Sequence, residues 1–143
     1  MDHLTPSERS RQMALVRHKD TKPEMAVRRL IHAMGFRFRL HDRRLPGCPD
    51  LVFPRHKKVI FVNGCFWHGH ASSSCKRGRL PKTRTDYWEE KLRRNRQRDI
   101  HNLEELRRRG WQSHVVWECQ IGNGEQLENE LREFFSSPRR DEP

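Results

Sequence analysis

The longest uninterrupted apolar run in this chain is only four residues long, Val59-Ile-Phe-Val62. A membrane-spanning helix needs about 20 apolar residues, so we expect no membrane span. A second short run, Leu51-Val-Phe53, precedes it, and the segment from Pro54 to Lys58 separates the two. Short apolar runs joined by a turn are typical of adjacent buried strands. The core of this chain is therefore predicted to contain a small β-sheet.

Helices are predicted on either side of these strands. Thr21-Lys-Pro-Glu24 has the capping-box arrangement, and an apolar stripe at helical spacing follows it and stops at Gly35. Thr5-Pro-Ser-Glu8 has the same arrangement and predicts a helix in the N-terminal arm. The segment from Thr85 to Arg109 reads as a long, exposed, basic helix.

The remaining elements follow from shorter patterns. Phe36, Phe38 and Leu40 alternate with polar residues, which predicts a half-buried strand over residues 36–40. Residues 112–117 predict a further strand, and apolar residues from Leu127 to Phe135 predict a C-terminal helix. The expected order is helix, three strands, helix, strand, helix, in a single α/β domain.

The charge of the chain points to a polyanionic partner. There are 30 Lys and Arg against 19 Asp and Glu, a net charge of +11. Such a charge favours encounter with nucleic acid, although ribosomal and membrane-surface proteins are also basic. The N-terminal residues MDHLTPSERSRQ contain no apolar stretch, so we expect no secretory signal and a cytoplasmic protein with reduced thiols.

Reduced cysteines in the cytoplasm are either metal ligands or buried thiols. Cys65, His70, Cys75 and Cys119 supply three thiolates and an imidazole, which is the ligand set of a closed tetrahedral zinc site. The alternative is ordinary buried cysteines. A loop of residues 63–84 without periodicity favours zinc, because such a loop needs a cross-link. Cys48, between Gly and Pro, is not part of this set.

Three polar residues are candidates for catalysis. Asp50 follows Pro49 at the start of a buried strand, where a carboxylate needs a cation or a strong hydrogen-bond donor as its partner. Mg²⁺ is a suitable cation. An Asp that caps a turn is the commoner explanation of this pattern. Glu24 is either the far half of a capping box or a functional acid. His68 could accept a proton from an attacking water, ligate zinc, or lie on the surface.

Aromatic residues lie close to basic ones in the same region. Phe66 and Trp67 are in the loop, and Trp88 follows Lys82 and Arg84. Rings beside cations suit stacking on bases or wedging between them. The alternative is that these rings pack over the loop.

Several of these segments together resemble the very short patch repair (Vsr-type) endonucleases. The resemblance runs in order over about residues 5–120, and Gly-Cys-Phe-Trp-His at residues 64–68 is its most specific motif. The other matching segments are Asp20 to Glu24, Leu45 to Asp50, Val59 to His70, Pro81 to Trp88, Asn95-x3-Asp99, and Gly110-Trp111 with Trp117-Glu-Cys119.

The resemblance implies a restriction-endonuclease-like core of helix, three strands, helix and strand. It also implies a magnesium-dependent enzyme that nicks duplex DNA 5′ to the thymine of a T:G mismatch left by deamination of 5-methylcytosine. We accordingly expect a DNA-contacting arm at residues 1–20, the endonuclease domain at 21–136 and a disordered tail at 137–143. A monomer in the bacterial cytoplasm, associated with the nucleoid and with mismatch-repair proteins as candidate partners, fits this expectation.

The resemblance also implies a role for each matching residue. Asp50 corresponds to the metal-binding carboxylate, Glu24 to the acid that supports the metal-bound water, and His68 to the catalytic histidine. The structural zinc ligands match Cys65, His70, Cys75 and Cys119. The aromatics that enter the DNA stack match Phe66, Trp67 and Trp88, and the residue inserted from the arm matches Met13.

Two positions in the catalytic segment depart from the family pattern. Asn63 stands where the best-known members have a second histidine, and an amide cannot exchange the proton that an imidazole can. We therefore assign the base to His68 alone. Val62 replaces a threonine but can still offer a backbone carbonyl to Mg²⁺. Two other functions remain open: a non-catalytic zinc-ordered DNA-binding module, and a related nickase or restriction-type nuclease with a different target.

Overall fold

The computed structural model describes residues 20–66, 70 and 82–138. The predicted N-terminal helix and most of the predicted loop lie outside these residues. The described elements are α2 (Lys22–Ala33), β1 (Arg39–Leu40), β2 (Leu51–Phe53), the 3-10 turn η1 (Pro54–His56), β3 (Lys58–Asn63), α3 (Thr85–Arg108), β4 (Gln112–Trp117), the 3-10 turn η3 (Glu118–Gln120) and α4 (Gly124–Ser136). This is the predicted α/β order of helix, three strands, helix, strand and helix.

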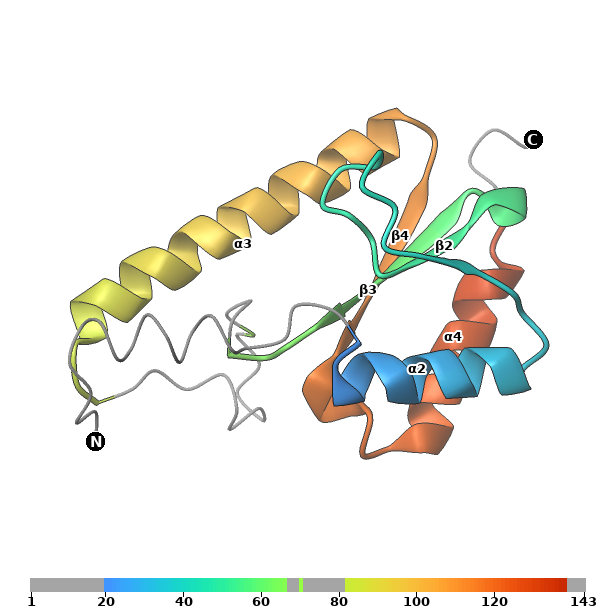
Figure 1. The fold of residues 1–143 in the computed structure, drawn as a ribbon, viewed down its shortest axis with the longest axis horizontal. Coiled ribbons are helices and arrows are strands. Elements are labelled where there is room, and N and C mark those ends of the chain that lie inside the picture. The colour runs from blue at the N-terminus through green and yellow to red at the C-terminus, as the bar shows by residue number, and fades with distance from the viewer. Residues whose placement is uncertain (1–19, 67–69, 71–81, 139–143) are drawn as a thin grey trace.

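The four strands form one mixed sheet in the order β1-β2-β3-β4 (Figure 1). The β1–β2 and β2–β3 pairs are antiparallel, and β3–β4 is parallel. Parallel neighbours need a long crossover connection, and α3 lies in the one between β3 and β4. The β3–β4 register runs from Lys58 opposite Gln112 to Asn63 opposite Trp117.

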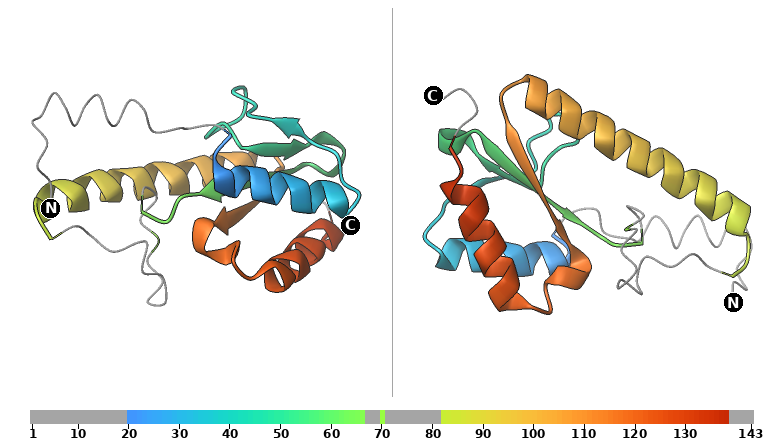
Figure 2. Two further views of the ribbon diagram at one scale, coloured as in Figure 1. Left: turned by 60° about the horizontal axis from the view of Figure 1, so that its bottom comes forward. Right: turned by 180° about the vertical axis from the view of Figure 1, so that it is seen from behind.

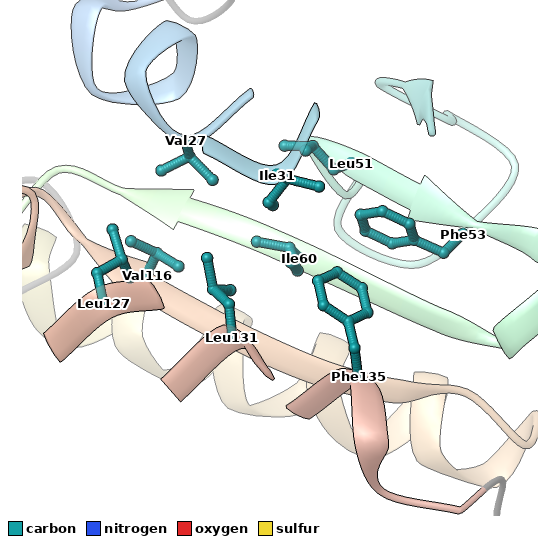
Figure 3. Packing of buried hydrophobic residues seen from close by; sticks show 9 residues of the cluster. All are labelled: Val27, Ile31, Leu51, Phe53, Ile60, Val116, Leu127, Leu131 and Phe135. Carbon is teal, nitrogen blue, oxygen red and sulfur yellow. The ribbon is translucent and has the colours of Figure 1, made fainter. Parts of the chain in front are cut away.

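The main core lies between the sheet and the two helices α2 and α4, which cover the same face (Figure 2). Nine buried side chains from these helices and from β2, β3 and β4 meet there (Figure 3). They are Val27, Ile31, Leu51, Phe53, Ile60, Val116, Leu127, Leu131 and Phe135. Burial of these side chains is the main source of the stability of the fold.

The opposite face of the sheet carries the C-terminal part of α3. Leu106 packs there against Val52 and Val59. The helix has 24 residues and so is about 36 Å long, and its N-terminal part extends past the sheet (Figure 1). Its only buried residues are Leu92 and Leu106, which confirms the prediction of a long exposed helix. None of the described helices is apolar enough over sufficient length to cross a membrane.

The predicted strand over residues 36–40 is wrong in extent. β1 contains only Arg39 and Leu40, and Leu40 is 43% exposed instead of facing the core. Phe36 stacks on Phe135 with ring centroids 4.0 Å apart, so it packs on α4 without joining the sheet. His41 then adopts a left-handed backbone with φ of 46°, which turns the chain and ends the alternation.

Lys58, at the start of β3, is a fully buried cation. Its Nζ donates to the carbonyls of Phe135 at 3.1 Å and Ser137 at 2.6 Å, and lies 5.4 Å from the centroid of the Phe134 ring. Carbonyls at a helix C-terminus carry partial negative charge. Lys58 therefore fastens the end of α4 to the sheet.

We predict that Lys58→Met lowers the free energy of unfolding by about 1–3 kcal/mol, because it leaves buried carbonyls unsatisfied. Urea denaturation monitored by circular dichroism measures this change. The control is Arg132→Met, whose side chain is 61% exposed and pairs with Glu128 on the surface of α4; its loss should be below about 1 kcal/mol. Equal losses in the two variants would contradict the anchoring role.

Candidate active site and metal centre

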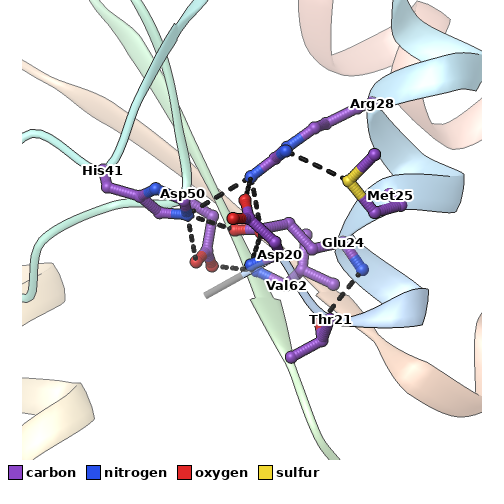
Figure 4. A network of polar contacts seen from close by, with 8 residues as sticks. All are labelled: Asp20, Thr21, Glu24, Met25, Arg28, His41, Asp50 and Val62. Carbon is purple, nitrogen blue, oxygen red and sulfur yellow. Dashed lines mark hydrogen bonds and ion pairs between the residues drawn. The ribbon is translucent and has the colours of Figure 1, made fainter. Parts of the chain in front are cut away.

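Two carboxylates that are distant in sequence meet where α2 approaches β2 and β3 (Figure 4). Glu24 lies in the first turn of α2 and is only 2% exposed. Asp50 immediately precedes β2, and its Oδ2 accepts the backbone N–H of Val62 at 2.7 Å. Antiparallel pairing brings the start of β2 beside the end of β3, so Asp50 reaches Val62. The fold thus brings together three residues that the sequence analysis assigned to the active site, namely Glu24, Asp50 and Val62.

The Glu24 side chain does more than cap a helix. Thr21 acts as the N-cap, its Oγ1 accepting the Glu24 N–H at 3.3 Å. The Glu24 Oε2 accepts from the Asp20 N–H and from Arg28 Nη2, both at 2.6 Å. Its Oε1 lies 2.6 Å from His41 Nε2. Glu24 is therefore the centre of a polar network that joins α2 to the segment after β1.

Sequence reasoning gave no role to Asp20, Arg28 or His41. Arg28 also donates to Asp20 Oδ1 at 2.7 Å, and His41 Nε2 lies 4.0 Å from Asp50 Oδ1. The spacing of four residues between Glu24 and Arg28 is a local signal of a helical ion pair that could have been used. His41 reaches the site only through the tertiary fold, and no local pattern marks it.

The environment of Asp50 raises the pKa of its carboxyl group from 3.8 to about 7. Burial is the largest cause, and the hydrogen bond from Val62 opposes it. The neighbouring Glu24 raises the pKa further, both by accepting a hydrogen bond from protonated Asp50 and by repelling the ionised form. A bound cation would remove this repulsion.

We predict that Asp50→Asn stabilises the protein at pH 8 but has little effect at or below about pH 4. Between about pH 4 and 7 the folded protein holds a proton on Asp50 that the unfolded chain has lost, so stability from this group falls as the pH rises. The variant should gain roughly 2–4 kcal/mol at pH 8. Urea denaturation at both pH values, in buffer without Mg²⁺, measures the difference.

The matched control is Asp86→Asn, at an exposed position in the first turn of α3. It should leave the pH dependence of stability as in the wild type. A gain from Asp50→Asn of the same size at pH 4 and pH 8 would show that burial of this carboxylate does not oppose its ionisation.

A second cluster contains sulfur and imidazole ligands. One ligand atom from each of Cys65, His70 and Cys119 lies within 4.8 Å of the others. The Cys119 Sγ is 3.5 Å from His70 Nδ1, and the His70 N–H donates to the Cys65 carbonyl at 2.8 Å. Three of the four predicted zinc ligands are therefore together; Cys75 lies outside the described residues.

The sheet positions this cluster. Cys65 and Cys119 each stand two residues beyond the last parallel pair, Asn63 and Trp117. The His70 ring stacks on Trp117, with centroids 4.1 Å apart and planes 7° from parallel. This contact orients the imidazole toward the sulfur atoms.

The residues proposed to contact DNA are only partly described. Phe66 meets Trp88 edge to face, with ring centroids 5.3 Å apart, so the loop aromatic lies beside the start of α3. Lys82 is exposed, and Arg84 covers the ring of Tyr87 at 4.9 Å from the centroid. The predicted residues Met13, Trp67 and His68 lie outside the described residues.

Asn63, the residue that departs from the family pattern, lies between the two clusters at the end of β3. It is 7% exposed, and its side chain makes no hydrogen bond to the other described residues.

Comparison with known proteins decides the family. The model of the family described as DNA mismatch endonuclease Vsr matches residues 1–76. The chain belongs to the Vsr family. This confirms the resemblance found in the motifs, and the chain is accordingly a DNA endonuclease of that family.

Full-length relatives agree with this assignment. The type II nicking enzyme V.XorIIP of Xanthomonas oryzae pv. oryzae is 50% identical over 94% of this chain and 96% of its own length. The type II nicking enzyme V.NmeAIP of Neisseria meningitidis is 46% identical over 85% of each. The DNA mismatch endonuclease Vsr of Escherichia coli is 38% identical over 85% of this chain and 76% of its own length.

Proposed function

We propose that this protein nicks one strand of duplex DNA, 5′ to the thymine of a T:G mismatch, in a magnesium-dependent reaction. The observation that carries the proposal is the meeting of Asp50 and Glu24 beside Val62 in a Vsr-family chain. Support for a mismatch as the target comes from the Escherichia coli relative, which is named a DNA mismatch endonuclease.

The residues present fit a hard divalent cation. Asp50 and the Val62 carbonyl offer oxygen ligands, which Mg²⁺ prefers. Among the described residues no N–H lies within hydrogen-bond distance of Asp50 Oδ1, so this oxygen can face a cation. A bound magnesium ion would polarise the scissile phosphate and stabilise the leaving oxygen. His68 would accept the proton of the attacking water, and Glu24 would orient that water.

The second cluster fits zinc. Thiolates and imidazole are soft to intermediate ligands, and Cys65, Cys119 and His70 converge as a tetrahedral site requires. Cys75 completes the proposed set. The role of the zinc ion would be structural, because it would join the residues that follow β3 and β4 at the end of the sheet.

We predict that the purified protein contains about one zinc ion per chain, and that Cys119→Ala lacks it and melts at a lower temperature. Mass spectrometry of metals and calorimetry measure the two effects. Cys48→Ala is the control, since Cys48 is not in the cluster, and it should retain zinc. Zinc-free wild-type protein of full stability would contradict the proposal.

DNA binding would use the basic surface and the aromatic pair. The segment from Lys91 to Arg98 on α3 carries five Lys and Arg, and together with an arm at residues 1–20 it would contact phosphates. Binding should therefore weaken steeply with salt. Phe66, Trp67 and Trp88, with Met13 from the arm, would enter the stack at the mismatch, where unstacking costs least.

The assay that tests the function is Mg²⁺-dependent nicking of a T:G duplex. We expect the wild type to nick it, and Asp50→Ala and His68→Ala to be slower by roughly 100-fold or more, because metal binding and proton transfer are impaired. Arg55→Ala, an exposed change on η1, should nick at the wild-type rate. Equal product from all four proteins would instead indicate a non-catalytic DNA-binding module.

A different target is the second candidate, because several relatives are named type II nicking enzymes. A screen of every mismatch in one duplex context separates the two functions. Selective nicking of T:G supports mismatch repair by a monomer in the bacterial cytoplasm near the nucleoid, with mismatch-repair proteins as partners. Equally rapid nicking of matched duplex would indicate a restriction-type target.

A further inference from the structure

His41, one of the partners of Glu24 in the polar network, has no role in the function proposed above. His41 follows β1, and its side chain is 13% exposed. Its backbone N–H donates to the Asp50 carbonyl at 3.1 Å, while its Nε2 lies 2.6 Å from Glu24 Oε1. His41 thus contacts both acids, one through its backbone and one through its ring.

The geometry determines the direction of the ring contact. A carboxylate oxygen only accepts, so the proton of this hydrogen bond is on His41 Nε2. The Arg28 Nη2 atom, 3.4 Å from the same nitrogen, is then a close neighbour and not a donor to it. Three nitrogen donors of the described residues reach Glu24: His41 on Oε1, and Arg28 and the Asp20 N–H on Oε2.

Each Glu24 oxygen thus has at least one donor from the protein. Asp50 differs, because only its Oδ2 accepts a backbone N–H, while Oδ1 lies 4.0 Å from His41 Nε2 and outside hydrogen-bond distance. The ring therefore holds Glu24 without binding the Asp50 oxygen that can face a cation.

We propose that His41 is a positioning residue for the carboxylate pair: its Nε2–H holds Glu24 beside Asp50 and does not occupy Asp50 Oδ1, the oxygen that would bind the cation. The inference rests on the proposed function, since it assumes that a divalent cation binds at Asp50. Groups that orient metal ligands typically change metal affinity by 10- to 100-fold when they are removed.

Three substitutions separate the side-chain role from the backbone role. His41→Gln keeps an N–H donor at nearly the position of Nε2. His41→Asn tolerates the left-handed backbone at this residue, φ 46°, but is too short to reach Glu24. His41→Ala removes the donor altogether.

The experiment measures Mn²⁺ binding to the DNA-free protein by electron paramagnetic resonance, and the Mg²⁺ dependence of T:G nicking. We expect His41→Ala and His41→Asn to weaken Mn²⁺ binding at least 10-fold and to raise the Mg²⁺ concentration for half-maximal nicking similarly. His41→Gln should restore both to within about threefold of the wild type. DNA affinity without metal should be unchanged in all three.

Wild-type metal binding and nicking in His41→Asn would overturn the inference. Loss in His41→Gln as large as in His41→Ala would also overturn it, because a donor alone would then not suffice. If His41→Ala does not fold, the Asn and Gln variants carry the same comparison. Failure of the proposed function is recognised separately, by a wild type that does not nick or by an Asp50→Ala variant that binds Mn²⁺ normally.

Discussion

The parallel pairing of β3 with β4 is the constraint on which both candidate sites depend. It requires a crossover, and α3 in that crossover carries the densest run of basic residues in the described chain. It also brings the residues after the two strands to one end of the sheet, which places Cys65 beside Cys119. On the other edge of β3, antiparallel pairing with β2 sets Asp50 against Val62. One central strand thus separates a hard oxygen site from a soft sulfur site.

The protein compensates the negative charges of Glu24 and Asp50 to different extents. Glu24 is more buried, yet it is surrounded by Arg28, His41 and a backbone N–H, which together satisfy its charge. Asp50 has a single backbone donor and an acidic neighbour, so its charge is poorly compensated by the protein. The network therefore gives two carboxylates in contact different properties, as a site that binds a cation on only one of them requires.

Features that depend on residues close together in the sequence could be predicted from the sequence alone. The basic helix was predicted at residues 85–109 and found at Thr85–Arg108, because its spacing and terminal Gly110 are local signals. Leu40 was misplaced because alternation does not show where a backbone turns. The zinc-type ligands could be proposed from residue type, but His41 could not, because its contact with Glu24 joins segments that only the packing of α2 brings together.

The anchoring of Lys58 has a consequence for how the protein is made. The carbonyls that neutralise this buried cation belong to residues 77 and 79 positions later in the chain. During synthesis β3 emerges long before them, and until they arrive an ammonium group at this position has no partner in the core and favours a hydrated state. The sheet can therefore close fully only after residue 137 has been synthesised, so folding of the nuclease core has to wait for α4.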